Sequence, residues 1–169
     1  ALANDLPGIT LEQVHFAIED GQGVLSAVVA RKAIGVSATL DNRGFDGLGP
    51  ARMLIAYDIN GLLSDDRLSL SGMVLTTPAH LSEQIVIGTR LSYALDNAGS
   101  NLEISGTRAH SHPGGSLLPY DLASNASFVD VTYSRPLARS RQSSVWVAAR
   151  AAFVDERQWQ GGIGTEHDR

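Results

Sequence analysis

Apolar and polar residues alternate regularly along most of this chain. In residues 51–60 the apolar side chains of Ile55, Tyr57 and Ile59 occupy odd positions, and the carboxylate of Asp58 falls between them. Because successive side chains of a β-strand point to opposite faces, this two-residue period predicts a strand with one apolar and one polar face.

Seven segments with this alternation follow one another, separated by turns rich in Gly, Asn, Asp and Pro. Their expected ranges are 33–42, 51–61, 67–77, 83–95, 101–110, 127–135 and 144–155. Most are close to the roughly 9–11 residues that a tilted strand needs to cross a bilayer, whereas strands of soluble sheets are usually about 5–6 residues long. We therefore predict a mainly β fold, an antiparallel up-and-down meander that is part of a membrane β-barrel.

The first 32 residues have a different pattern. Pro7 and Gly8 interrupt what reads as the tail of a helix, and two strands separated by "EDGQG" follow. The alternation slips near Gln13, which predicts a β-bulge in the first of these strands. Residues 1–32 are therefore predicted to be the C-terminal part of a small α/β domain, and residues 33–169 the N-terminal part of a barrel.

Charged residues are concentrated on the polar face of the predicted strands. We expect these to face the barrel interior: Arg52, Asp58, Arg67, Arg90, Glu103, Asp130 and Arg150. Reversing the two faces would place four arginines in lipid, where each costs roughly 2–4 kcal/mol near mid-depth. The interior is either a hydrated, salt-bridged passage or simply a polar wall whose groups satisfy one another, and the pattern is compatible with both.

A few residues mark the ends of the predicted strands. Tyr57, Tyr93 and Tyr133 each lie toward the finishing end of every second strand, so a meander would place them at one rim, as an interfacial girdle requires. Arg108 and Arg135 occupy positions whose side chains the alternation places on the apolar face. We expect them at strand ends, where the cost of an arginine falls to about 0–1 kcal/mol.

The predicted connections differ in length between the two ends of the meander. The turns "NGLLSDD", "DNAGSN" and "SRPLARSRQ" fall at the tyrosine end, and the opposite end carries a long loop, "HSHPGGSLLPYDLASNA". Short periplasmic turns and longer outer loops are typical of outer-membrane barrels.

Composition narrows the function classes. The net charge is −5 and the arginines are scattered, which argues against a nucleic-acid partner. The absence of cysteine excludes disulfides and thiolate chemistry. The chain begins at Ala1, and its end, "QGGIGTEHDR", resembles the middle of a loop, so we expect a piece of a longer protein.

No motif predicts catalysis. His110 and His112 are two positions apart, so on a strand they would lie on one face and could hold a metal ion together. No third ligand is in register with them, and the following Pro-Gly-Gly marks an exposed loop. The adjacent acids Asp155 and Glu156 would point to opposite faces of a strand. We therefore predict a protein that is not an enzyme and has no metal site and no cofactor.

Three segments, taken in order, resemble one known family. "LANDLPGITL" followed by "VVARKAIGVSATLDNRG" resembles the junction between the second POTRA domain and the barrel in the haemolysin-activator, or TpsB, family of two-partner secretion transporters. "GLLSDDRLSLSG" resembles the first periplasmic turn and next strand of that family, and "VDVTYSRPL" resembles its recurrent strand end. The likeness extends from Leu2 to about Arg157.

The resemblance implies a function in protein secretion. Members of this family lie in the bacterial outer membrane and export a large partner protein without ATP. By this resemblance, residues 1–32 would end a periplasmic POTRA domain that binds the unfolded partner by strand addition. The barrel lumen would be the conduit, with the outer-membrane bilayer around it. The V-R-G-Y loop of the family's barrel has no counterpart in this chain.

Two other classes of protein share the alternating pattern. A soluble β-sandwich that acts as a binding or adhesion module would pack its apolar face against a second sheet. A porin or a barrel-assembly factor would have the same barrel architecture with a different function.

Overall fold

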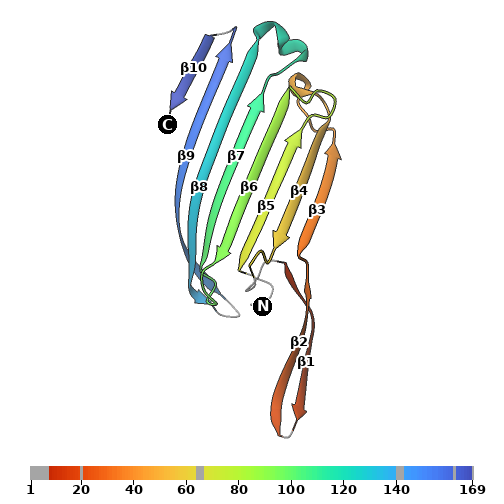
Figure 1. The fold of residues 1–169 in the computed structure, drawn as a ribbon, viewed down its shortest axis with the longest axis vertical. Coiled ribbons are helices and arrows are strands. Elements are labelled where there is room, and N and C mark those ends of the chain that lie inside the picture. The colour runs from red at the N-terminus through yellow and green to blue at the C-terminus, as the bar shows by residue number, and fades with distance from the viewer. Residues whose placement is uncertain (1–7, 20, 64–66, 140–142, 162, 169) are drawn as a thin grey trace.

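The computed structural model describes residues 8–19, 21–63, 67–139, 143–161 and 163–168, and most of these residues lie in β-strands (Figure 1). They form two separate antiparallel sheets, and two short 3₁₀ helices lie in loops. None of the described helices is long and apolar enough to cross a membrane. The predicted mainly β, antiparallel fold is confirmed.

The smaller sheet is a hairpin of β1 (Ile9–Glu19) and β2 (Gln22–Arg31). Its register shifts between Leu11 and Gln13, which confirms the predicted bulge. The α/β character predicted for this region is not shown, since the described part is a β-hairpin and the expected helix tail lies within residues 1–7, outside the described residues.

The larger sheet contains eight strands, and each pairs with its neighbours in sequence. Their bounds are β3 (Ile34–Asp41), β4 (Arg52–Asn60), β5 (Leu68–Thr76), β6 (Gln84–Ala94), β7 (Asn101–Ser111), β8 (Leu122–Arg139), β9 (Ser144–Gln160) and β10 (Ile163–Asp168). This order confirms the meander. The strands lie side by side in one layer, and the hairpin projects from the end of the sheet that carries the short turns (Figure 1).

The last three strands differ from the sequence prediction. Seven strands were expected in this sheet and eight are described, because the segment predicted to be a loop at the chain end contains β10. β8 and β9 contain 18 and 17 residues, and both extend well beyond their predicted ranges. The backbone ladder between β8 and β9 continues from Leu122 to Arg139 and therefore past the apolar stretch that predicted them.

Two loops at the end opposite the hairpin contain the 3₁₀ helices η2 (Asp46–Leu48) and η3 (Gly115–Tyr120). The loops after β3 and β7 are joined by the Gly114 N–H, which donates to the Gly47 carbonyl at 2.8 Å. The His112 N–H donates to the Glu83 carbonyl at 2.9 Å and joins the loop after β5. We call this the loop end of the sheet and the opposite one the turn end.

The larger sheet has no apolar core of its own. No hydrophobic side chain among the described residues is buried, and large ones such as Val36 (71% exposed) and Phe153 (64%) are open to the surroundings. This follows from the single layer, because nothing in the described chain packs on either face. Exposed apolar area on this scale marks a surface that contacts another apolar phase or partner.

Tyr57 lies against Gly72 on the neighbouring strand. The two residues are cross-strand partners, and a Cβ atom added to Gly72 would lie 2.5 Å from the Tyr57 Oη. The ring therefore occupies the space that a side chain on β5 would fill. An aromatic ring that covers a glycine in this way shields the backbone and helps to define strand register.

We expect Gly72→Ala to destabilise the fold by about 1–3 kcal/mol, because the new methyl group displaces the Tyr57 ring. Urea unfolding of the detergent-solubilised protein measures this. In the Tyr57→Ala background the same substitution should cost much less, since the ring is gone. Equal costs in both backgrounds would contradict this contact.

Candidate functional site

Cross-strand register places most of the large apolar side chains on one face of the larger sheet, although Leu54, Leu75 and Val86 form a row on the opposite face near the loop end. One continuous row across β4 to β8 consists of Ile59, Leu70, Leu91, Ile104 and Val131. Neighbours in such a row have their Cβ atoms about 4.5–5.5 Å apart, so the row is a continuous apolar surface. We call the apolar part of this face the apolar band.

The apolar band runs obliquely across the strands. A single row of cross-strand partners connects Tyr57 on β4 with Phe153 on β9. On β4 the band continues from this row toward the loop end, as far as Met53, whereas on β9 it continues toward the turn end, as far as Val145. The band is therefore displaced along the strands from one side of the sheet to the other.

This displacement has the size expected from strand tilt. Between β3 and β9 the band moves along the strands by about five residues, or about 17 Å at about 3.3 Å per residue. The distance across the sheet between these two strands is about 29 Å, at about 4.8 Å per strand. The corresponding slope is roughly 30°. Strands of membrane barrels are tilted by about 35–45°, so a band parallel to the bilayer plane would cross them at a similar angle.

The opposite, polar face carries a hydrogen-bonded network centred on Asp130 of β8. This side chain is only 5% exposed. The Ser105 hydroxyl donates to one carboxylate oxygen, while Arg150 Nε at 2.9 Å and the Thr132 hydroxyl at 3.3 Å donate to the other. The Arg150 guanidinium also lies over the Phe128 ring, 5.3 Å from its centroid.

A second ion pair continues this network toward β6. Arg90 Nε lies 3.2 Å from Glu103 Oε1, and Arg90 is the cross-strand partner of Ser105, which contacts Asp130. Together with Arg150 these residues form two neighbouring ion pairs, Arg90–Glu103 and Arg150–Asp130, across β6 to β9. We call them the polar belt. Four of the seven charges predicted to face the interior are thus brought together.

The other three predicted interior charges lie apart from the polar belt. Arg52 donates from Nε and Nη2 to both carboxylate oxygens of Asp41, each at 3.1 Å, and clamps β4 to β3 at the loop end. Arg67 precedes β5 at the turn end, where it donates to the Leu95 carbonyl at 3.4 Å. Asp58 lies on β4, in the row of Ser71.

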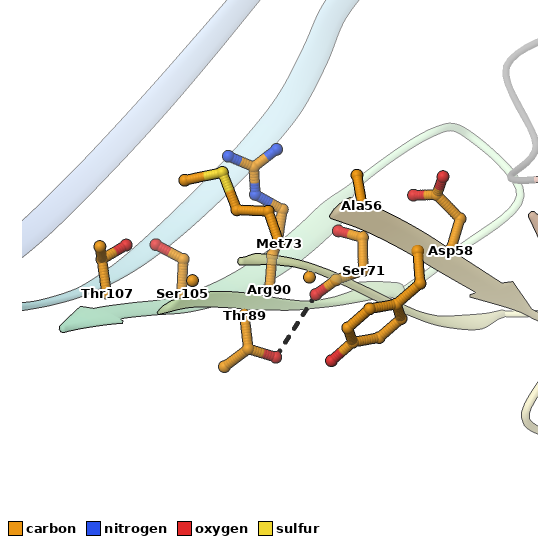
Figure 2. A pocket seen from close by; sticks show the side chains of 11 residues that line it. Ala56, Asp58, Ser71, Met73, Thr89, Arg90, Ser105 and Thr107 are labelled. Carbon is orange, nitrogen blue, oxygen red and sulfur yellow. Dashed lines mark hydrogen bonds between the residues drawn. The ribbon is translucent and has the colours of Figure 1, made fainter. Parts of the chain in front are cut away.

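A shallow groove of about 270 Å³ lies over β4 to β7. Its polar-face floor contains small residues, among them Ala56, Gly88 and Ser105, and the Met73 side chain lies on the same face beside Gly88. Figure 2 shows the longer side chains of Asp58 and Arg90 on this same side of the sheet. The small residues leave space between these two opposite charges.

The three tyrosines of the predicted girdle do not share one row. Tyr93 and Tyr133 are both partners of Leu102, so these two flank it near the turn end. Tyr57 belongs to the row of Thr89, which lies four residues farther along β6 toward the loop end than Tyr93. Because the apolar band crosses the strands obliquely, residues of different rows can lie at the same depth, and the girdle stays a prediction.

Arg108 and Arg135 are not at strand ends as predicted. β7 continues to Ser111 and β8 to Arg139, so both arginines lie within their strands. Both are exposed on the face of the apolar band, Arg108 on its loop-end side and Arg135 on its turn-end side.

The predicted histidine pair does not converge on a common site. His110 Nδ1 lies 2.8 Å from Asn125 Oδ1, and His112 Nε2 lies 3.7 Å from Asp121 Oδ1 in the following loop. The described residues contain no group of three or more histidine, aspartate or glutamate side chains placed to hold a metal ion.

Sequence reasoning missed the uncharged members of the polar belt. Ser105 and Thr132 have the parity of the polar face, but a hydroxyl residue on a strand gives no sign of its partner. The pairing of Asp41 with Arg52 was missed for the same reason.

The turn between β6 and β7 is organised by the Asp96 carboxylate. The Ser100 hydroxyl lies beside it, and the N–H groups of Ser100, Ala98 and Gly99 donate to it at 3.0, 2.9 and 3.0 Å. These donors lower the pKa of Asp96 below its ordinary value. Gly99 has a φ of 103°, a backbone conformation that favours glycine.

The lowered pKa of Asp96 predicts a pH-dependent turn. The charged carboxylate stabilises the folded state fully above the pKa of the unfolded chain, and this contribution is lost as the pH falls through the lower folded-state pKa. We expect Asp96→Asn to reduce the fall in stability on acidification. Unfolding temperatures of both proteins across the acidic range test this, and parallel curves would contradict it.

No known protein family, curated protein or solved structure matches this chain. The geometry by itself defines a class of architecture: one antiparallel meander with an uncovered apolar band on one face and a charged, hydrogen-bonded belt on the other.

Proposed function

We propose that this chain forms part of the wall of a bacterial outer-membrane β-barrel that exports a large partner protein, as in the haemolysin-activator family that its sequence resembles. The observation that carries the proposal is the uncovered, oblique apolar band on a single-layer meander. In such a barrel the band faces lipid, and further strands join the free edges of β3 and β10 to close the wall.

The arrangement of the strands favours a barrel wall over a β-sandwich. A sandwich buries its apolar face against a second sheet about 10 Å away. In this chain all strands from β3 to β10 belong to one sheet, and the described residues place nothing over the apolar band. Lipid contact accounts for this exposure without a second sheet.

The polar face suits a hydrated passage for an extended polypeptide. The polar belt presents both signs of charge, and its members are already paired with one another. Such a wall offers hydrogen bonds to water and to a passing backbone, while its paired charges hold no single sequence strongly. A conduit for a long, chemically varied chain requires this weak selectivity.

The hairpin suits a periplasmic position and strand addition. It lies at the turn end, which in an outer-membrane barrel is the periplasmic side (Figure 1). Phe16, Ile18 and Leu25 are exposed on one of its faces. An unfolded partner could add a strand to one hairpin edge through backbone hydrogen bonds, which require little sequence specificity.

The membrane part of the proposal is tested with the intact protein in its native cells. We expect it in the outer-membrane fraction after carbonate washing, with solubilisation only by detergent. A folded barrel should also migrate faster on a denaturing gel when unheated than after boiling. Recovery in the soluble periplasmic fraction would exclude the barrel.

The export part is tested separately by deleting the gene. We expect one large protein to disappear from the culture medium and to accumulate inside the cell envelope, and re-expression of the intact protein should restore its release. If the same proteins are secreted with and without the gene while small solutes enter more slowly, the barrel is a porin instead.

A further inference from the structure

A patch of polar and cationic side chains interrupts the face of the apolar band at the loop ends of β7, β8 and β9. It consists of two adjacent rows of cross-strand partners, which we call the loop-end patch: Arg108, Ser127 and Asp155 in the first row, and His110, Asn125 and Arg157 in the second. On β10 the same two rows continue to Asp168 and Glu166. The band ends directly beside the first row, at Val129 and Phe153.

Arg108 lies on β7, on the side of the loop-end patch farthest from the carboxylate residues of β9 and β10. Arg157 Nε lies 3.5 Å from Asp155 Oδ1, so the carboxylate of the patch already has a cation beside it. Arg108 is exposed between Ile87 and Ser127, its partners on β6 and β8. Among the described residues no carboxylate lies within ion-pair distance of its guanidinium.

The neighbouring strand places an apolar wall beside this cation. In the same two rows β6 carries Ile87 and Ile85, and Ile87 is half exposed. The patch therefore combines a guanidinium and hydrogen-bonding groups with an adjacent apolar surface that continues toward the middle of the band. A ligand with an anionic head and acyl chains matches this combination.

We propose that the loop-end patch binds the phosphate-bearing headgroup of an outer-leaflet glycolipid, with the phosphate at Arg108 and an acyl chain that runs from Ile87 toward the middle of the band. This inference rests on the proposed function, because the patch lies at headgroup depth only if the apolar band crosses the membrane. Arginine is suited to the role, since its planar donors match phosphate oxygens in a bidentate geometry.

The test uses the intact protein in phosphatidylcholine nanodiscs to which lipid A is added, with native mass spectrometry to count retained lipid. We expect Arg108→Gln to weaken lipid A binding by about tenfold, which corresponds to the loss of one charge-assisted hydrogen bond. Arg108→Lys should retain part of the affinity. Arg135→Gln is the matched control, because it removes a cation from the same face at the opposite end of the band.

Two further probes identify the chemistry. Lipid A without its phosphates should bind the wild-type protein about as weakly as lipid A binds Arg108→Gln. Inorganic phosphate should not compete at concentrations similar to those of lipid A, because the acyl chain contributes to binding; effective competition would overturn the lipid assignment in favour of a free anion site. Equal lipid A binding by wild type and Arg108→Gln would overturn the site.

Failure of the proposed function gives a different result. A protein that does not enter nanodiscs at all refutes the barrel before any lipid is added. A protein that enters them normally but loses no lipid A on Arg108→Gln refutes only the headgroup site.

Discussion

Leu91→Arg should prevent most of the protein from assembling in the membrane. Leu91 lies in the middle of the apolar band, between Leu70 and Ile104 on the neighbouring strands. An arginine there would face lipid near mid-depth, at a cost of roughly 2–4 kcal/mol, and barrel strands form only together. Refolding into vesicles in urea, followed by gel mobility without heating, measures the folded fraction.

The neighbouring residue provides a matched control. Ser92 belongs to the same strand but to the polar face, where its cross-strand partner is Glu103. Ser92→Arg adds the same side chain at nearly the same depth, next to a carboxylate and away from lipid. We expect it to fold much better than Leu91→Arg, and equal folding of the two variants would contradict the assignment of the faces.

Arg150→Glu should be the most damaging charge change on the polar face. It replaces the cation that donates to Asp130 at 2.9 Å with a second carboxylate, while Asp130 itself is almost fully buried. Like charges at such a short distance repel each other. We expect the unfolding temperature in detergent to fall by several degrees.

A second substitution shows whether Arg150→Glu destabilises the protein through charge repulsion or through loss of packing. In Arg150→Glu/Asp130→Asn one of the two carboxylates becomes a neutral amide, so much of the lost stability should return. The same reversal at the more exposed Arg90, beside Glu103, should have a smaller effect. If Asp130→Asn gives no recovery, the damage does not arise from charge repulsion.

The alternation of apolar and polar residues predicted both ends of each strand from β3 to β7 to within one residue, but it predicted β8 and β9 poorly. Near their loop ends these strands carry Ser127 and Asn125 opposite Asp155 and Arg157, all on the face that is apolar elsewhere. Once the outward face becomes polar, alternation disappears, although the backbone ladder continues. Strands that extend beyond an apolar environment are therefore shortened in a prediction based on hydrophobicity.

The sequence predicted on which face each charged residue of the candidate site lies, but it did not predict which of these residues pair. The two-residue alternation along each strand placed four charged side chains on one face: Arg90, Glu103, Asp130 and Arg150. Which of them meet depends on the stagger of neighbouring strands, and a shift of two residues preserves every face while changing every partner. The rows of the three tyrosines depend on the same stagger, which offsets Tyr57 along the sheet from Tyr93 and Tyr133.

The sequence by itself determined that the chain folds as antiparallel strands and which side chains share a face, because the period of a strand is a local property of the backbone. Only the tertiary structure decided the register, and with it the oblique apolar band, the pairing of Arg150 with Asp130, and the isolation of Arg108 beside Ile87. These depend on hydrogen bonds between segments far apart in the chain, and no local pattern encodes their alignment.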